Sequence, residues 1–304
     1  MLILGAGASH PYGFPCGEKF REQILSVVGE GFHEHAINAF KEQFSGSDLA
    51  SIDRFLDECQ KRPERDPFPN KVIIEMGKAA IAHALLPCEN PTSTVRDWYG
   101  SLVDALTKGY QEERATKLTI LTFNYDRSLE FHLLRSLKAI DGGRKFDGAK
   151  VQKMVEIIHV YGQLGELPFW NNTEDVVIYG EETQISTAMK GIRVIGDRAD
   201  DAHLKLIRSK IKEASALAFI GFGFLDENME LLQIPPQAEK PAFASTFRLG
   251  PGKKVTLKAN YPNLNWVFGT YDSDAKDFLH QTDFFTALTS KSPGALATLA
   301  YQLP

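Results

Sequence analysis

The chain has 304 residues, of which 43% are hydrophobic and 24% are charged, with a formal net charge of -5. This composition is typical of a globular protein with one large core or two moderate ones. The negative charge argues against general affinity for nucleic acid, which needs a positive surface. Three cysteines without a CxxC pair exclude a zinc ribbon built from this chain alone. No apolar run is long enough to span a bilayer. We therefore expect a cytoplasmic protein with no membrane segment and no direct sequence-specific binding of nucleic acid.

Four short apolar segments, each followed by turn residues, predict buried strands of a parallel sheet. They are residues 2–4, 118–123, 155–161 and 217–222. Weaker strand candidates are residues 176–179, 191–195, 243–248, 255–258 and 266–269. Apolar residues at helical spacing predict helices over 18–28 and 127–137, between the strong strands. Strands that alternate with helices indicate the α/β class.

Residues 29–109 show almost no strand pattern. Helical patterns cover 49–60, 71–85 and 95–108, with a proline-rich loop at 62–70. The sequence thus predicts a Rossmann-like nucleotide-binding domain, made of residues 1–28 and 110–304, with helices on both faces of its sheet. The helical segment 29–109 is predicted to be an inserted subdomain. A basic stretch at 205–212 is interpreted as the wet face of an amphipathic helix, and residues 291–304 are weakly patterned.

The first strand ends in a Gly-x-Gly turn, Gly5-Ala6-Gly7-Ala8-Ser9. Glycines let the backbone come within contact distance of a diphosphate. The third glycine of the usual dinucleotide pattern is missing, since His10 stands in its place, and no acidic residue closes a second strand about 20 residues on. A tight strand-to-helix turn without a ligand is the alternative explanation.

Polar residues follow the second strong strand, in Thr122-Phe123-Asn124-Tyr125-Asp126. Ligands of open α/β sheets bind outside the carboxyl ends of the strands, which is where Asn124 and Asp126 are predicted to lie. An amide can bridge sugar hydroxyls, and a carboxylate can accept from a carboxamide N–H. Asp126 also suits the N-terminus of the following helix, so a purely capping role is the alternative.

These motifs occur in a recognisable order. GAGAS is followed by Gly13-Phe14-Pro15, then TFNYD, a strand ending in HVYG, and IGFGF with Leu225-Asp226-Glu227. The combination resembles the sirtuin (Sir2) superfamily, and in particular the Sir2-like NADase domains of prokaryotic anti-phage defence proteins, which lack the zinc ribbon. The resemblance extends from residue 5 to about residue 228, as short islands.

The resemblance implies a site that binds NAD as substrate, with no metal. Asn124 matches the family asparagine on the nicotinamide ribose, and Asp126 matches the acid that holds the nicotinamide carboxamide. The remaining matches are the diphosphate loop, Gly5, Ala6, Gly7 and Ser9, and the glycine turn near the adenosine half, Gly221 and Gly223.

The chain departs from the family pattern at the catalytic histidine, whose position before Gly162 is taken by Tyr161. His159 lies two residues earlier, and residues i and i+2 share one face of a strand. A histidine with a pKa near 6.5 suits general-base catalysis at neutral pH better than a tyrosine with a pKa near 10. We therefore predict His159 as the catalytic base and Tyr161 as a substrate contact. A histidine buried for structural reasons is the alternative for His159.

Two further departures count against deacylation of acyl-lysine peptides. Sirtuin deacylases continue after Pro15 with Asp-Phe-Arg, whereas this chain has Cys16-Gly17-Glu18, and the zinc module that borders the peptide cleft is missing. The sequence predicts an NAD⁺ glycohydrolase that releases nicotinamide and ADP-ribose, as an NAD-depleting effector of anti-phage defence. The alternative is a non-catalytic module that binds NAD or ADP-ribose; deacylation and ADP-ribosyl transfer are disfavoured. A preference for NAD over NADP is left open.

The same resemblance implies that the chain works with other subunits. Sir2-like defence proteins depend on a sensor that is fused to them or separately encoded. We expect a homo-oligomer and a separately encoded sensor partner, with a HerA-type ATPase favoured over a short Argonaute. The helical insert at 49–106 is the expected interface.

Overall fold

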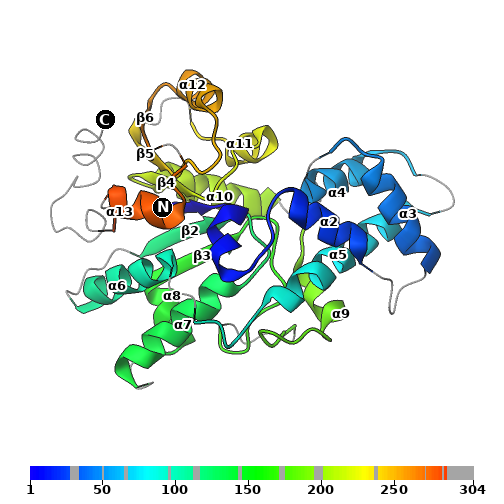
Figure 1. Ribbon diagram of the computed structural model, residues 1–304, viewed down its shortest axis with the longest axis horizontal. Helices are drawn as coiled ribbons and strands as arrows, with labels where there is room; N and C mark the ends of the chain where they lie inside the picture. The colour runs from blue at the N-terminus through cyan, green and yellow to red at the C-terminus, as the bar shows by residue number, and fades with distance from the viewer. Residues whose placement is uncertain are drawn as a thin grey trace.

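The protein is built on a six-stranded, all-parallel sheet surrounded by helices (Figure 1). The computed structural model describes residues 1–27, 34–49, 51–64, 68–94, 97–111, 117–142, 146–170, 175–194, 201–235, 239–270, 272–282 and 284–285. The strand order is β3-β2-β1-β4-β5-β6. The strands are β1 (Leu2–Leu4), β2 (Leu118–Thr122), β3 (Val155–His159), β4 (Leu217–Ile220), β5 (Lys240–Ala244) and β6 (Leu264–Phe268).

This order confirms the predicted Rossmann-like α/β fold, because it is the doubly wound order. Strands β2 and β3 are added on one side of β1, and β4 to β6 are added on the other side, so the switch point lies between β1 and β4. Ligands of such sheets bind outside the carboxyl ends of the strands at that switch point. The register aligns Leu4 with Thr122 on one side and with Ile220 on the other. Thr122 is aligned in turn with His159. The segments after β1, β2, β3 and β4 therefore leave the sheet at one level.

Helices follow most strands and also form a group of their own. Their bounds are α1 (Ala6–Ser9), η1 (His10–Tyr12), α2 (Glu18–Ser26), α3 (Glu34–Ser45), α4 (Ile52–Lys61), α5 (Asn70–Leu85), η2 (Leu86–Cys88), α6 (Trp98–Gln111), α7 (Ser128–Asp141), α8 (Gly148–Met154), α9 (Ile185–Ala188), η3 (Met189–Gly191), α10 (Asp201–Glu213), α11 (Asp226–Leu232), α12 (Pro251–Asn260) and α13 (Ala275–Gln281). None of the helices in the described part of the chain is long and apolar enough to cross a bilayer.

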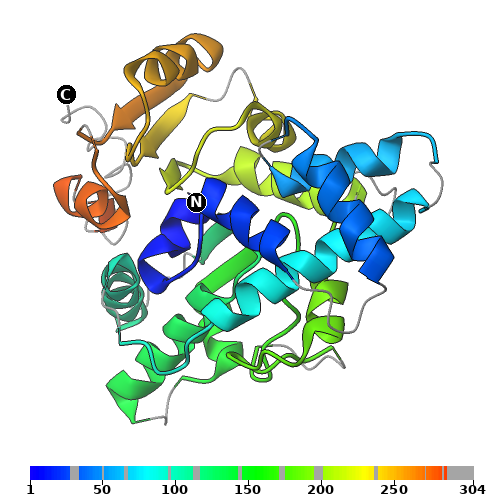
Figure 2. The same ribbon diagram turned by 45° about the vertical axis from the view of Figure 1, so that its right-hand side comes forward.

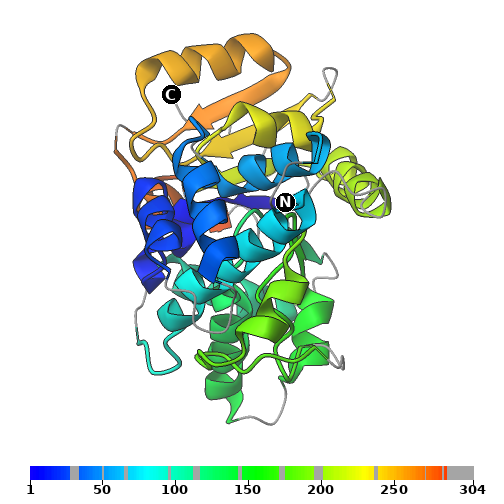
Figure 3. The ribbon, with the colours of Figure 1, turned by 90° about the vertical axis from the view of Figure 1, so that its right-hand side faces the viewer.

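Helices α2 to α5 gather at one side of the molecule, as Figures 1, 2 and 3 show from three directions. Within this group, α5 packs against α2, α3 and α4. Helix α6 lies elsewhere, against α7 and α13. The described part of the predicted insert is thus helical, but its last helix packs with the helices that follow the sheet strands.

The four strong strand predictions are confirmed, with β2, β3 and β4 ending one or two residues before the predicted limits. Of the weaker candidates, 243–248 overlaps β5 and 266–269 overlaps β6. Segments 176–179 and 191–195 contain only isolated bridges, Glu166 to Val176 and Gly162 to Ile192, and residue 195 lies outside the described residues.

The prediction of a strand at 255–258 is wrong, because these residues belong to α12. Pro251 stands in the first turn of that helix, where its missing N–H costs no hydrogen bond. Leu257 is buried and Val255 is 69% exposed, so one apolar side chain faces the core and the other faces solvent. The β-branched Val-Thr pair favours a strand only locally, and packing decides otherwise.

The predicted helices at 18–28, 49–60, 71–85, 95–108 and 127–137 correspond to α2, α4, α5, α6 and α7, and 205–212 lies within α10. The predicted loop at 62–70 ends where α5 begins, at Asn70. Residues 28, 50, 65–67, 95, 96 and 291–304 fall outside the described residues.

Candidate functional site

The two predicted glycine turns touch each other at the switch point of the sheet. Gly5 N donates to the carbonyl of Ile220 at 3.1 Å, and Gly7 N donates to the carbonyl of Gly221 at 3.0 Å. A Cβ on Gly5 would lie 2.6 Å from Gly221 O, and one on Gly7 would lie 2.9 Å from Gly221 Cα. The close approach of two backbones therefore requires glycine at both positions.

Gly221 and Gly223 differ in what they require. Gly221 has φ +57, and a Cβ there would run into Ala8 and Gly7. Gly223 has an ordinary φ, and a Cβ there would meet no atom of the protein within 4 Å. The first glycine is explained by the fold, whereas the second stands beside open space at the carboxyl edge of β4.

The side chain of Asn124 is bonded to the first glycine turn. Its Nδ2 donates to the carbonyl of Gly5 at 3.0 Å and to Ser9 Oγ at 2.9 Å. A carbonyl can only accept, so these partners orient the amide with its nitrogen toward the turn. The Asn124 N–H donates to Thr122 Oγ1 at 3.1 Å. Asn124, which is 9% exposed, is therefore fixed through both its main chain and its side chain.

Asp126 lies in the same polar network. It accepts hydrogen bonds from the side chains of Ser9 and Ser128 and from the Ser128 N–H. The Ser128 hydroxyl donates its only hydrogen to Asp126. The Tyr99 hydroxyl must therefore donate to Ser128 Oγ, at 2.8 Å. Burial raises the pKa of Asp126, and these hydrogen bonds only partly oppose that rise. Asp126 also accepts from the first N–H of α7, but the N-cap of that helix is Arg127, which makes no side-chain capping bond. The alternative role of Asp126 as the N-cap is therefore wrong by one position.

His159 is buried beside the main chain of Asn124, and each of its ring nitrogens has a hydrogen-bond partner. Nδ1 lies 2.8 Å from the main-chain oxygen of Asn124, and Nε2 lies 2.6 Å from Glu130 Oε1. Burial lowers the pKa of His159, but the Glu130 carboxylate and the two hydrogen bonds outweigh it, and the net pKa is raised. With both nitrogens bonded inside the protein, His159 offers no free nitrogen to a substrate in this conformation.

Tyr161 lies two residues beyond the carboxyl end of β3, which is His159. Its hydroxyl donates to Asn228 Oδ1 of α11 at 2.7 Å. Its ring lies edge-on to Phe123, with 5.7 Å between centroids, and is tilted against Tyr125 at 6.3 Å. Burial raises the pKa of Tyr161, with neighbouring carboxylates adding to the effect, so its hydroxyl stays protonated.

The helical segment supplies direct contacts to these loops. Trp98 Nε1 donates to the carbonyl of Ala8 at 2.8 Å, and Tyr99 N donates to the hydroxyl of Tyr12 at 2.9 Å. The Tyr125 hydroxyl donates to Asp53 of α4. Burial raises the pKa of Asp53 to about 6, against the lowering effect of its hydrogen bonds from Tyr125 and Ser51.

A buried ion pair fixes the residue that follows Asp126. Arg127 Nε donates to Glu89 Oε1 at 3.0 Å, and Arg127 Nη1 donates to the carbonyl of Val177 at 2.6 Å. Both side chains of the pair are 0% exposed. The pair joins the turn after η2 to the segment between β2 and α7, next to the polar network of Asp126.

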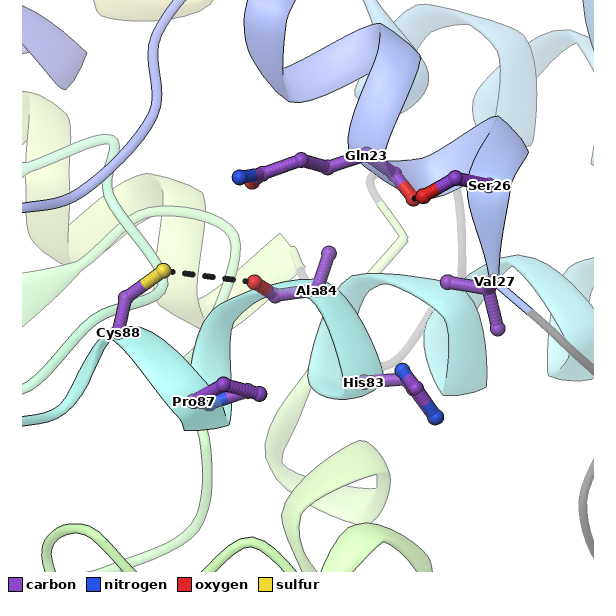
Figure 4. A pocket seen from close by; sticks show the side chains of 7 residues that line it. All are labelled: Gln23, Ser26, Val27, His83, Ala84, Pro87 and Cys88. Carbon is purple, nitrogen blue, oxygen red and sulfur yellow. Dashed lines mark hydrogen bonds between the residues drawn. The ribbon is translucent and has the colours of Figure 1, made fainter.

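A described cavity of about 450 Å³ lies between α2 and the end of α5 (Figure 4). Gln23, Ser26 and Val27 line one wall, and His83, Ala84, Pro87 and Cys88 line the other. None of the predicted site residues lines it. Cys88, in its lining, has a pKa that is raised by burial first and then by the charge of Asp126.

The structure thus brings Gly5, Gly7, Ser9, Asn124 and Asp126 into one bonded cluster with the Gly221 turn. Ala6 is exposed beside it. His159 lies behind Asn124, and Tyr161 and Gly223 lie at the strand ends nearby. No group of three or more His, Cys, Asp or Glu side chains within the described ranges could hold a metal ion.

Sequence reasoning missed several partners in this cluster, namely Tyr99, Ser128, Glu130, Asp53 and Asn228. One of them carried a detectable pattern. Glu130 shares a helical stripe with Leu133, Leu134 and Leu137, all of them buried. A carboxylate on the apolar stripe of a helix needs a buried partner.

A comparison with known protein families and with characterised proteins found no match to this chain. The resemblance to the Sir2 superfamily therefore stays a prediction that rests on the short motifs quoted above.

Proposed function

We propose that the chain is an NAD⁺ glycohydrolase whose site lies at the carboxyl ends of β1, β2 and β4. The observation that carries the proposal is the double hydrogen bond from Asn124 Nδ2 to Gly5 O and Ser9 Oγ. It joins the residue predicted to hold the ribose to the loop predicted to lie along the diphosphate. Both belong at the switch point, where dinucleotides bind in sheets of this strand order.

The proposed reaction breaks the bond between the ribose C1′ and the nicotinamide nitrogen. The bonding electron pair leaves with nicotinamide, which becomes neutral, and the ribose carries oxocarbenium character. Water then adds to C1′ and loses a proton to give ADP-ribose. A protein accelerates this step by fixing the ring and by stabilising the positive charge that develops on it.

Asn124 is suited to orient the ribose. With its amide nitrogen committed to Gly5 and Ser9, its amide oxygen faces away from them and can accept from a ribose hydroxyl or from the attacking water. Asp126 would hold the carboxamide of nicotinamide, and its negative charge would favour the cationic transition state. Tyr161 would contact the substrate from the end of β3.

The test is incubation of the purified chain with NAD, followed by chromatography with mass detection of nicotinamide and ADP-ribose. Asn124→Ala should lower turnover at least about 100-fold, in line with the loss of a group that orients and stabilises charge. Asn265→Ala, on the exposed face of β6, is the matched control and should not change turnover. Equal rates for all three proteins would refute the role of Asn124.

A second candidate function is a non-catalytic module that binds NAD or ADP-ribose. The occupied nitrogens of His159 and the bond between Tyr161 and Asn228 favour it, because neither residue presents a free base. Calorimetry that finds tight NAD binding, with no product under any condition, would select this function. Deacylation and ADP-ribosyl transfer stay disfavoured, and an acyl-lysine peptide assay tests them.

We further propose, from the family resemblance alone, that the chain forms a homo-oligomer and works with a separately encoded sensor. A HerA-type ATPase is favoured over a short Argonaute, and NAD depletion during phage infection would be the outcome. Light scattering of the chain alone, and with each candidate partner, measures both assemblies. A monomer in all three samples would contradict the proposal.

A further inference from the structure

The Glu130–His159 pair is a buried titratable pair in contact with Asn124 that the proposed reaction does not yet use. Glu130 is 2% exposed and His159 is 9% exposed. Glu130 Oε1 meets His159 Nε2, while Glu130 Oε2 is buried with no hydrogen-bond partner among the described residues. The carboxylate therefore depends on the ring for its compensation, because a buried unpaired charge is costly.

The contacts, taken with an ionised Glu130, assign the hydrogens of the ring. The main-chain oxygen of Asn124 can only accept, so His159 Nδ1 carries a hydrogen toward it. An ionised Glu130 can also only accept, so Nε2 carries a second hydrogen. A ring with hydrogen on both nitrogens is the imidazolium, and the raised pKa of His159 agrees with this state. A general base needs the opposite state, a neutral ring with a bare nitrogen.

We propose that Glu130 and His159 form a charged positioning pair: Glu130 keeps the His159 ring protonated, and the ring holds the main chain of Asn124 in place for its side chain to act on NAD. The inference rests on the proposed NAD cleavage for its catalytic part. It replaces the predicted general-base role of His159, and it assigns a role to Glu130, which no motif indicated.

The geometry on the far side of Asn124 explains why one main-chain bond matters. Asn124 Nδ2 must reach Gly5 O and Ser9 Oγ at once, so a displacement of its backbone would break one of the two bonds. The ring of His159 is hydrogen-bonded to the main-chain oxygen of the same residue from the β3 side. The carbonyl of His159 is itself contacted by His203 Nε2 of α10, at 3.1 Å.

The titratable groups that face His159 come from three elements. Glu130 belongs to α7, Asp126 follows β2, and His203 belongs to α10. The two carboxylates favour the charged ring, and the charge of Asp126 has the smaller effect. The loss of Glu130 should therefore let burial dominate and should lower the pKa of His159.

The two roles of His159 predict opposite pH limbs. A general base is active when neutral, so turnover would rise as the pH passes upward through the pKa of His159. In a positioning imidazolium both nitrogens donate, whereas a neutral ring keeps its one hydrogen on Nε2 toward Glu130 and no longer donates to Asn124. Turnover would therefore fall over the same range. In Glu130→Gln this alkaline fall should move to lower pH, by roughly 1–3 pH units for the loss of an adjacent carboxylate.

The first experiment needs no activity. Nitrogen-15 NMR of histidine-labelled protein is recorded against pH for the wild type and for Glu130→Gln, with His159→Asn to assign the signal. We expect a doubly protonated His159 ring at pH 7 in the wild type, a pKa that falls in Glu130→Gln, and an Asn124 amide shift that follows the ring. A neutral ring at pH 7, or a titration that Glu130→Gln leaves unchanged, would overturn the proposal.

The second experiment measures turnover of NAD against pH in the same proteins and in the double variant His159→Asn, Glu130→Gln. The double variant keeps an N–H for Asn124 O and leaves no buried charge unpaired. It should retain turnover within about tenfold of the wild type, without the alkaline fall. Complete loss in the double variant, with a folded protein by NMR, would restore the general-base role and overturn the positioning pair. Absence of turnover in every protein, with the expected NMR titration, would refute the NAD cleavage but not the pairing.

Discussion

The two halves of the sheet are built differently at their carboxyl ends. Beyond β1, β2 and β3, six polar residues of the site are almost inaccessible, since Ser9, Asn124, Asp126, Ser128, Glu130 and His159 are each 9% exposed or less. Beyond β4 and β5, Leu225 is 41% exposed and Phe247 is 54% exposed, and the side chain of Asp226 is 87% exposed. The first, closed half is a network of bonded polar groups. The second, open half exposes these side chains beside a smaller buried polar group, Ser245 and Thr246.

This contrast indicates that the two halves contribute differently to function. Bonded, buried groups hold a fixed geometry, which catalysis requires of the residues that orient the reacting bond. Open turns with exposed side chains can contact a ligand without such precision. We therefore expect substitutions in the first half to change stability and turnover together, and substitutions in the second half to change mainly nucleotide affinity.

The largest expected effect comes from breaking the buried ion pair of the closed half. Arg127→Met leaves the carboxylate of Glu89 buried and unpaired, which should lower the free energy of unfolding by about 3–5 kcal/mol. Urea denaturation followed by circular dichroism measures it. Adding Glu89→Gln to Arg127→Met should recover most of the loss, and a double variant as unstable as the single one would contradict the unpaired charge as the cause.

The two glycines of the β4 turn provide the next largest effect and its matched control. Gly221→Ala should destabilise by about 2–4 kcal/mol, since φ +57 strains alanine and its Cβ would push Gly7 away. Gly223→Ala should change stability by less than about 0.5 kcal/mol, since its Cβ enters open space.

The same two glycines also allow a test of NAD binding to the open half. If bound NAD occupies the space beside Gly223, Gly223→Ala should raise the Kd for NAD several-fold in calorimetry without affecting stability. An unchanged Kd would remove Gly223 from the proposed site.

A smaller effect is expected where the helical group meets the closed half. Burial raises the pKa of Asp53 to about 6, against a usual value of 3.8, so the folded state holds a proton there that the unfolded state has released. The carboxyl group thus costs stability progressively as the pH rises from about 4 to 6, and the full cost persists above that range.

Asp53→Asn should remove this cost and still accept from Tyr125. Relative to the wild type, it should gain roughly 1–2 kcal/mol of stability between pH 4 and pH 7, after a discount because Asp53 is half-buried rather than fully buried. Thermal melts of both proteins at three pH values measure the difference. A constant difference across that range would place the raised pKa of Asp53 in doubt.

The smallest effect belongs to the open half. Lys253 pairs with Asp226 at 2.9 Å, but the carboxylate is largely exposed, so solvent screens the pair. Lys253→Ala should change the free energy of unfolding by less than about 0.5 kcal/mol in urea denaturation. A loss above 1 kcal/mol would show that the open half is more tightly coupled than the contrast implies.

The fold was predictable because its strands are buried on both faces and read as short apolar runs. Leu2–Leu4 and Leu217–Ile220 are examples, and both are fully or almost fully buried. The outer part of the sheet was harder to predict. In β5, Lys240 and Pro241 hide the strand pattern, and the Lys240 ammonium is accommodated only because it donates to three carbonyls at the end of α10, among them Ile211 O.

The site was predictable in its anchor residues but not in its connections. Asn124 and Asp126 follow a strong strand, and the strand order brings them to the glycine turn. The partners of His159 depend on contacts between residues 29 and 35 positions apart in sequence. Spacing along a strand placed His159 and Tyr161 on one face. It could not show that Glu130 of α7 is hydrogen-bonded to Nε2 of the His159 ring.

The most direct test of the central claim is a single-turnover experiment, with the purified chain in excess over NAD so that slow product release cannot hide the chemistry. Quenched samples of the wild type and of Asn124→Ala are resolved by chromatography with mass detection. The account predicts that the wild type converts bound NAD into equal amounts of nicotinamide and ADP-ribose, and that Asn124→Ala leaves it intact. Recovery of unchanged NAD from a wild-type protein that has bound it, both alone and with each candidate partner, would contradict the account.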